Sequence, residues 1–165
     1  MDGLPPALLH PMNPKHVATG DLDGSRQDEL IVDFGSVYGV WVLWNNQRWA
    51  QLHPMTSNGI AVGDLDASGR KDLVIDFPGF GIYAYMNAAS WVYEFGMSTN
   101  QKIVTVDTDG GGDEVFVSIP DRGLWRRSSS TRAWTQFHAM NPLALGSGDF
   151  DGNGRGDLVA SFSGW

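Results

Sequence analysis

Four short acidic loops recur along the chain, and their carboxylates have the spacing of ligands for a hard metal ion. The loops read DLDGSRQDEL from Asp21, DLDASGRKDL from Asp64, DTDGGGDEV from Asp107 and DFDGNGRGDL from Asp149. Their first aspartates recur at steps of 42 or 43 residues. A ligand spacing repeated at this period favours a repeated β-sheet array that carries cations over an enzyme with a single active site.

The fourth loop carries the full ligand pattern. Asp149, Asp151, Asn153, Arg155 and Asp157 occupy positions 1, 3, 5, 7 and 9. Alternate positions of a tightly wound loop point inward, so we expect four side chains and the backbone carbonyl at position 7 to surround one ion. Because the set contains only oxygen ligands, it selects a hard cation. Ca²⁺ is favoured over Mg²⁺, which gives up its waters reluctantly.

The other three loops keep this pattern to different degrees. In the first two loops the candidate ligands are Asp21, Asp23, Ser25, the Gln27 carbonyl and Glu29, then Asp64, Asp66, Ser68, the Arg70 carbonyl and Asp72. In the third loop, which is one residue shorter, they are Asp107, Asp109, Gly111 and either Asp113 or Glu114. Because Gly111 offers no side-chain oxygen, we expect the third loop to bind a metal ion most weakly or not at all.

Three other interpretations of the loops are weaker. An EF-hand needs a Glu at position 12 and flanking helices, but position 12 of the fourth loop is Ala160 and the flanks are strand-like. The RGD tripeptide at 155–157 is typical of integrin recognition, but we expect Asp157 to face the ion. Asx-rich turns that only cap strands explain one such loop better than four in register, because a turn does not need carboxylates at positions 1, 3 and 9 together.

The segments between the loops predict an all-β fold. In the second unit, residues 60–63, 72–77, 81–87 and 91–95 are rich in β-branched or aromatic residues and are bounded by turn-forming residues. No long window has the apolar period of a helix. Four antiparallel strands in this length make one β-propeller blade, in which the acidic loop would join the innermost strand to the second.

The repeat also predicts how the blades are divided. We expect a single domain with complete blades at about 14–55, 56–97 and 98–140 and a half blade at 141–165, which is about 3.5 blades per chain. The PALLHPM segment resembles an outermost strand, so residues 1–13 of the same or another chain would complete the half blade. Open sheet edges favour closure between two chains, which gives a homodimeric ring of about eight blades. The alternative is a truncated piece of a seven-bladed parent that closes differently.

Charge and composition exclude several classes of partner. The formal net charge is −8, and 14 of the 19 acidic residues lie in the four loops, so neither nucleic acid nor an anionic membrane surface is an expected partner. The chain has no cysteine, which excludes disulfides and thiolate metal sites. No apolar run is long enough to insert into a membrane, and the first residues lack a signal-peptide pattern. We expect the parent protein to be extracellular.

The core pattern D-x-D-x-[DNS]-G-x-x-D-L is met in full by residues 64–73 and 149–158. It resembles the FG-GAP/VCBS repeat family, whose members are the calcium-loop propellers of integrin α-subunit heads, certain fungal lectins and many secreted bacterial proteins. The first loop departs from it at Arg26, which replaces a glycine, and the third departs by its deletion. The resemblance covers nearly the whole chain and implies a propeller with calcium in its loops and a scaffold or recognition role. It does not identify a ligand.

Aromatic residues support a second functional hypothesis, a lectin-like module with carbohydrate sites between blades. The tryptophans that recur once per unit are expected to pack between blades, because large aromatic side chains contribute most to burial in thin layers. Trp44 has no aromatic counterpart in the other units and is the better sugar-binding candidate, with His53 and His138 as polar neighbours.

Catalysis is not expected. The sequence contains no G-x-S-x-G, Walker or H-E-x-x-H motif, and its paired carboxylates all belong to the repeated loops. An acid–base pair should instead stand out in one unit. The sequence therefore predicts a calcium-binding scaffold or assembly module without catalytic activity.

Overall fold

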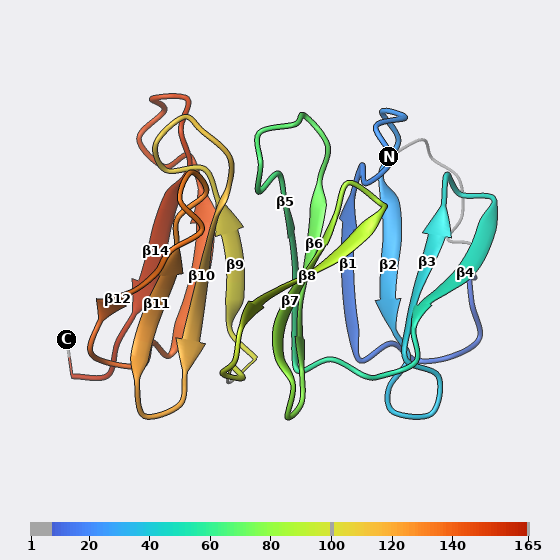
Figure 1. Ribbon diagram of the computed structural model, residues 1–165, viewed down its shortest axis with the longest axis horizontal. Helices are drawn as coiled ribbons and strands as arrows, with labels where there is room; N and C mark the ends of the chain where they lie inside the picture. The colour runs from blue at the N-terminus through green and yellow to red at the C-terminus, as the bar shows by residue number, and fades with distance from the viewer. Residues whose placement is uncertain (1–7, 100, 165) are drawn as a thin grey trace.

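The computed structural model describes residues 8–99 and 101–164, and within them the protein is all-β, as predicted. Fourteen strands form four antiparallel sheets, three with four strands and one with two (Figure 1). The first sheet consists of β1 (His16–Gly20), β2 (Glu29–Asp33), β3 (Val40–Trp44) and β4 (Arg48–His53). The second consists of β5 (Gly59–Gly63), β6 (Asp72–Phe77), β7 (Gly81–Met86) and β8 (Ser90–Phe95). The third sheet consists of β9 (Ile103–Val106), β10 (Glu114–Ile119), β11 (Gly123–Arg127) and β12 (Trp134–His138). The fourth consists of β13 (Ala144–Gly148) and β14 (Asp157–Ser161). No helix in this part of the chain could cross a membrane.

The strands predicted for the second unit are confirmed to within one residue at either end. Residues 8–12 pair with none of the described strands, so a strand here that completes the half blade of another chain stays a prediction. The Met12 N–H donates to His10 Nδ1 (3.3 Å), the same bond that Met55 makes to His53 (3.2 Å) at the end of β4, so residues 10–12 repeat the turn that ends an outer strand. Residues 6 and 7 of that predicted strand lie outside the described part of the chain.

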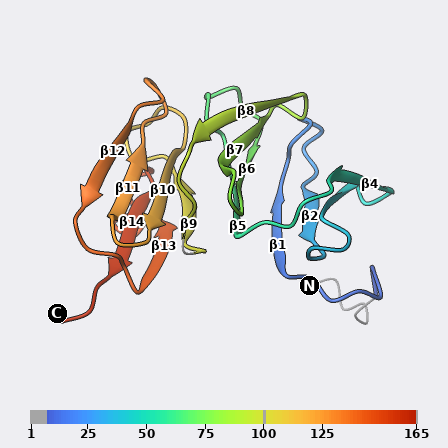
Figure 2. The ribbon, with the colours of Figure 1, turned by 60° about the horizontal axis from the view of Figure 1, so that its bottom comes forward.

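Successive sheets stand side by side through their first strands. β1 contacts β5, β5 contacts β9, and β9 contacts β13. Figure 2 shows this row of first strands with β4, β8 and β12 farther out along their sheets. Each acidic loop joins the first strand of its sheet to the second, as predicted. The four loops therefore lie at the same end of the strands, one loop on each sheet.

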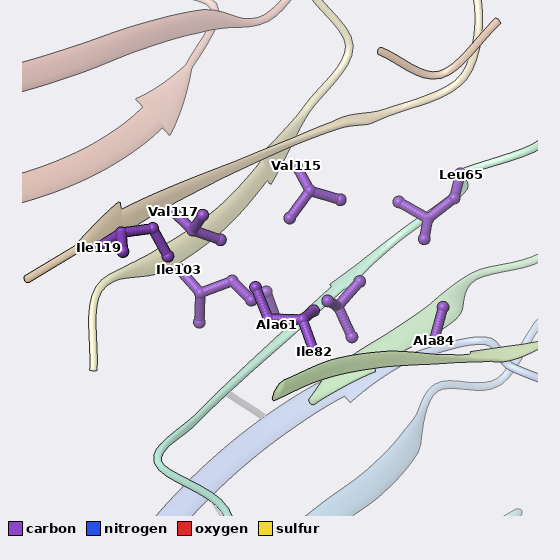
Figure 3. Packing of buried hydrophobic residues seen from close by; sticks show 9 residues of the cluster. Ala61, Leu65, Ile82, Ala84, Ile103, Val115, Val117 and Ile119 are labelled. Atoms are coloured by element: carbon purple, nitrogen blue, oxygen red, sulfur yellow. The ribbon is translucent and has the colours of Figure 1, made fainter. Parts of the chain in front are cut away.

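Each pair of neighbouring sheets encloses an apolar core. Between the first and second sheets, Leu22 and Ile31 pack with Leu73 and Ile75. The core between the second and third sheets contains nine buried residues, among them Ile82 and Val117, which Figure 3 labels. A smaller cluster around Phe116 holds the fourth sheet against the third. Burial at about 25 cal/mol per Å² of apolar surface makes these inter-sheet cores the main stabilising contacts.

A glycine stands at the start of the third strand of each four-stranded sheet, as the first residue of β7 and β11 and as the residue just before β3. Gly81 has φ of 93°, and a side chain there would collide with the carbonyl oxygen of Phe95 on the adjacent outer strand. Gly39 and Gly123 repeat both features. Only glycine combines a left-handed backbone with so close an approach, which explains why it recurs at this position.

Candidate metal centres

Each acidic loop brings three carboxylates together. In every group the candidate ligand atoms lie within 4.8 Å of one another. The groups are Asp21, Asp23 and Glu29; Asp64, Asp66 and Asp72; Asp107, Asp109 and Glu114; and Asp149, Asp151 and Asp157. The carboxylates at positions 1 and 3 and the closing carboxylate, at position 9 or at position 8 of the shortened third loop, therefore converge in all four loops, where they could hold a metal ion.

The closing carboxylate of the second loop is fixed by backbone donors. Asp72 is fully buried at the start of β6, and its two oxygens accept N–H bonds from Leu65 (2.9 Å) and Asn87 (2.8 Å). Burial raises the pKa of Asp72, the two N–H bonds oppose that rise, and repulsion from Asp66 and Asp64 adds to it. A dication between the three carboxylates would relieve this repulsion, which is the electrostatic condition for a binding site.

Sequence reasoning missed two asparagines that support the first two loops. Asn87 lies in the turn between β7 and β8, where it donates from Nδ2 to Asp66 Oδ2 (2.8 Å) and accepts a bond from the Ser68 hydroxyl (2.9 Å). Asn45, in the turn between β3 and β4, makes the equivalent bonds in the first loop. Such outer partners orient ligand carboxylates around a metal ion. The two asparagines are 42 residues apart, which matches the repeat and could have marked them as equivalent. Their contact with the loops, however, becomes clear only once the pairing of the strands is known.

The donor set of the second loop fits a cation. Asp64 accepts N–H bonds from Ser68 (2.9 Å) and Gly69 (2.8 Å), one on each oxygen. A carboxylate has about four lone-pair positions, so these bonds leave room for a metal ion on the same oxygens. The side chain of Arg70 is exposed at position 7, in agreement with a role for its backbone carbonyl alone. Gln27 in the first loop is exposed in the same way.

The fourth loop is the most open of the four. Asp149 and Asp151 are exposed, and Asp157 is half-buried, with Oδ2 accepting the Phe150 N–H (2.9 Å). Asn153 donates from Nδ2 to Asp151 Oδ2 (2.8 Å) and accepts the Arg155 N–H on Oδ1 (2.8 Å), so its side chain lies beside the cluster, and its role as a ligand stays a prediction. In the fourth loop, the asparagine that donates to the carboxylate at position 3 is Asn153, at position 5 of the loop itself. In the first two loops, that asparagine comes from a neighbouring hairpin turn.

The third loop closes with Glu114, and Asp113 lies elsewhere. The Asp113 carboxylate accepts the Asp64 N–H (2.6 Å) and pairs with Lys71 (3.2 Å), both in the second loop. The one-residue deletion explains the difference, because it shifts Glu114 into the closing position at the start of β10. Gly111 is exposed, and weak or absent metal binding by this loop stays a prediction.

A guanidinium lies against the third cluster. Arg126 on β11 places a terminal nitrogen 3.1 Å from Glu114 Oε1 and 3.8 Å from Asp109 Oδ2. Burial acts to raise the pKa of Glu114, but hydrogen bonds from Thr108 and the neighbouring Arg126 outweigh it and lower that pKa. The third loop thus has a cationic partner within the protein.

Backbone hydrogen bonds connect each loop to the next. The N–H near the end of one loop donates to the first carbonyl of the preceding loop. The three bonds run from Lys71 to Asp21 (2.8 Å), from Asp113 to Asp64 (2.6 Å) and from Gly156 to Asp107 (2.8 Å). The loops therefore form a connected row, which we call the loop ladder.

The three candidate sugar-binding residues do not converge. Trp44 lines a hollow of about 440 Å³ between the first and second sheets, whereas His53 lines a different one of about 320 Å³. His138 packs on Phe162 with ring centroids 4.3 Å apart. His53 packs on Phe77 in the same manner, at 4.3 Å, and this repeated contact gives the histidines a packing role.

Comparison with known protein families found no match, and comparison with curated proteins found none either. The residues and geometry of the four loops are therefore the guide to function. The strongest part of that geometry is the repeated convergence of carboxylates at one end of the sheets.

Proposed function

We propose that the protein is a calcium-binding β-propeller scaffold of the FG-GAP/VCBS type and has no catalytic activity. The observation that carries the proposal is the convergence of three carboxylates at equivalent positions in all four loops. In the first two loops the closing carboxylate is fully buried, and burying such a charge beside two others is costly unless a cation accompanies it.

The chemistry of the loops favours calcium among the hard cations. The converging groups are carboxylates supplied by one short segment, and Ca²⁺ accepts six to eight oxygens in flexible geometry. Mg²⁺ demands near-ideal octahedral geometry and keeps several waters, which suits such loops less well. Calcium would then rigidify the connection between the first two strands of each blade.

Glu29→Gln should reduce the number of calcium ions bound per chain by one, because it neutralises the buried closing carboxylate of the first loop. Asp28→Asn is the matched control, since Asp28 is the adjacent exposed carboxylate and lies outside the cluster. Isothermal titration calorimetry gives both ion counts. Each occupied site should add about 2.7 kcal/mol to the free energy of unfolding at calcium a hundredfold above its Kd.

Thermal unfolding in calcium and in chelator provides the decisive comparison. Calcium should raise the Tm of the wild type more than that of Glu29→Gln, whereas Asp28→Asn should match the wild type. A wild-type chain that takes up no calcium, and whose Tm is the same with calcium and with chelator, would refute the proposal.

We also propose that the chain assembles with a second copy through its two terminal sheets. Val159 on β14 occupies the position that Val74 and Phe116 occupy in earlier sheets, where the following sheet buries them to 1% exposure. Val159 itself is 49% exposed, and Val17 on β1 is 53% exposed at the opposite end. Joining these two unlike faces repeats the contact made between sheets within the chain, and two copies would close a ring of about eight blades.

A specific hollow supports carbohydrate binding as a second candidate function. Trp44 and Tyr85 face it together with the polar side chains of Arg48, Gln51 and Asp23, the last of which belongs to the first carboxylate cluster. Aromatic faces with polar groups beside them suit a sugar ring, and the shared aspartate would make binding sensitive to calcium. A glycan array with and without chelator tests this, and Trp44→Ala should abolish any signal. No binding to any glycan would exclude the second function.

A further inference from the structure

Arg126 supplies a cation to the third loop from a strand outside it. Its guanidinium lies 3.1 Å from Glu114 Oε1 and 3.8 Å from Asp109 Oδ2, and its side chain is about two-thirds shielded from solvent. Its Nε is buried without a hydrogen-bond partner among the described residues. The position of Arg126 on β11 therefore places its positive charge at the cluster, although its guanidinium does not have a full set of hydrogen bonds.

The equivalent positions of the other sheets carry no charge. Arg126 pairs with Phe116 on the neighbouring strand, as Val42 pairs with Ile31 and Ala84 pairs with Val74. Val42 and Ala84 are fully buried in the inter-sheet cores. An arginine at this position therefore distinguishes the third sheet from the first and second.

The hydrogen bonds of Glu114 leave no room for a metal ion. Oε2 accepts bonds from the Thr108 N–H (3.0 Å) and the Thr108 hydroxyl (2.7 Å), while Oε1 accepts from the Ser129 hydroxyl (3.2 Å) and meets Arg126. These four partners occupy about all the lone-pair positions of a carboxylate. Asp72, the equivalent residue of the second loop, has only one donor on each oxygen.

We infer that Arg126 takes the place of the metal ion in the third loop, so that this loop is closed by a side chain and binds no calcium. The inference depends on the proposed function, since it assigns calcium to the first, second and fourth loops only. The shortened loop and Gly111 alone already favour weak metal binding by the third loop. The inference adds that the Arg126 guanidinium neutralises the carboxylates of this loop.

The test compares matched substitutions at position 3 of two loops. Asp66→Asn in the second loop should lower the calcium count by one ion per chain, while Asp109→Asn in the third should leave it unchanged. Both side chains are exposed, so neither change disturbs the core. Isothermal titration calorimetry measures the counts. A loss of one ion in Asp109→Asn would overturn the inference and leave the proposed function intact, whereas a wild type that binds no calcium would overturn the proposed function itself.

Arg126→Ala introduces the residue found at the equivalent position of the second sheet. It should bind one calcium ion more than the wild type, and its Tm in chelator should fall below that of the wild type because the third cluster loses its cation. Arg126→Lys retains the charge and should keep the wild-type count. If Arg126→Ala folds, as judged by circular dichroism, and still binds no additional ion, then the shortened backbone excludes the metal and the inference is wrong.

Discussion

His16 is a half-buried imidazole on β1 whose Nε2 has no hydrogen-bond partner among the described residues. Burial lowers the pKa of His16, and the neighbouring Lys15 lowers it further, while Asp33 acts in the opposite direction. The folded protein therefore takes up a proton on His16 at a lower pH than the unfolded chain does. This difference makes the folded state less stable in acid.

His16→Gln should reduce the loss of stability on acidification. As the pH falls below about 6.5, the unfolded chain binds a proton that folded His16 resists, so the wild type loses stability until the lower folded pKa is passed. The glutamine variant lacks this contribution, and the difference in Tm between the two proteins should shift in favour of the variant between neutral and mildly acidic pH. A difference in Tm that stays constant with pH would contradict this role of His16.

The residue-level sites divide into those that local sequence predicts and those that it cannot. Spacing within one segment predicted the converging aspartates and Glu29, because a tight loop brings alternate side chains to one point. Asn87 and Arg126 reach the same clusters from hairpins that lie after the loop in sequence. Their roles depend on which strands pair and in which register, and that information is not local.

At the scale of elements, the contact between the second and third sheets contains a buried ion pair. Glu94 on β8 and Arg127 on β11 make two contacts, of 2.9 and 3.2 Å, with side chains 3% and 1% exposed. The exposed Arg132 also reaches Glu94, at 2.7 Å. The equivalent residues between the first and second sheets are Leu52 and Tyr85, which line one hollow together.

Arg127→Leu should destabilise the protein by about 3 to 5 kcal/mol, because it leaves the Glu94 carboxylate buried without its main partner. The double variant Glu94→Leu with Arg127→Tyr copies the pair found between the first two sheets and should recover most of that loss. Chemical denaturation measures the free energy of unfolding of each protein. A double variant as unstable as Arg127→Leu would show that the two sheet contacts are not interchangeable.

Strand positions were the most predictable feature at this scale. β6 and β7 begin at the residues expected from the turn-forming residues before them, and Gly81 marks the start of β7. The N-terminal segment stays a prediction, because the apolar residues Leu8 and Leu9 suggest a strand but pair with none of the described strands of their own chain. A strand needs a partner, and sequence alone does not say whether one is present.

At the scale of the whole molecule, the row of sheets has two unlike apolar ends. The described part of β14 pairs only with β13, and its face carries Val159, while Val17 marks the far face of β1. Within the chain, every equivalent face is covered by the next sheet. The two terminal faces are therefore suited to each other, and a head-to-tail contact between two copies would bury both of them.

Val159→Asp should shift the protein from dimer to monomer, since it buries a charge at the proposed contact. Val37→Asp is the control, because Val37 is equally apolar and 80% exposed but lies in a turn away from the terminal faces. Multi-angle light scattering gives the molar mass of each. A wild type that stays at 18.0 kDa at all concentrations would contradict assembly through these faces.

The loop ladder gives the four loops a further property. Each rung fixes the first peptide carbonyl of one loop to the closing backbone of the next, so ordering one loop lowers the entropy that its neighbour must still lose on ligation. If the loops bind calcium as proposed, nearest-neighbour coupling of this kind would make ion uptake cooperative, as in a one-dimensional array. The third loop, which by our inference Arg126 keeps closed at every calcium concentration, has no such entropy left to lose and would interrupt the coupling between the second loop and the fourth.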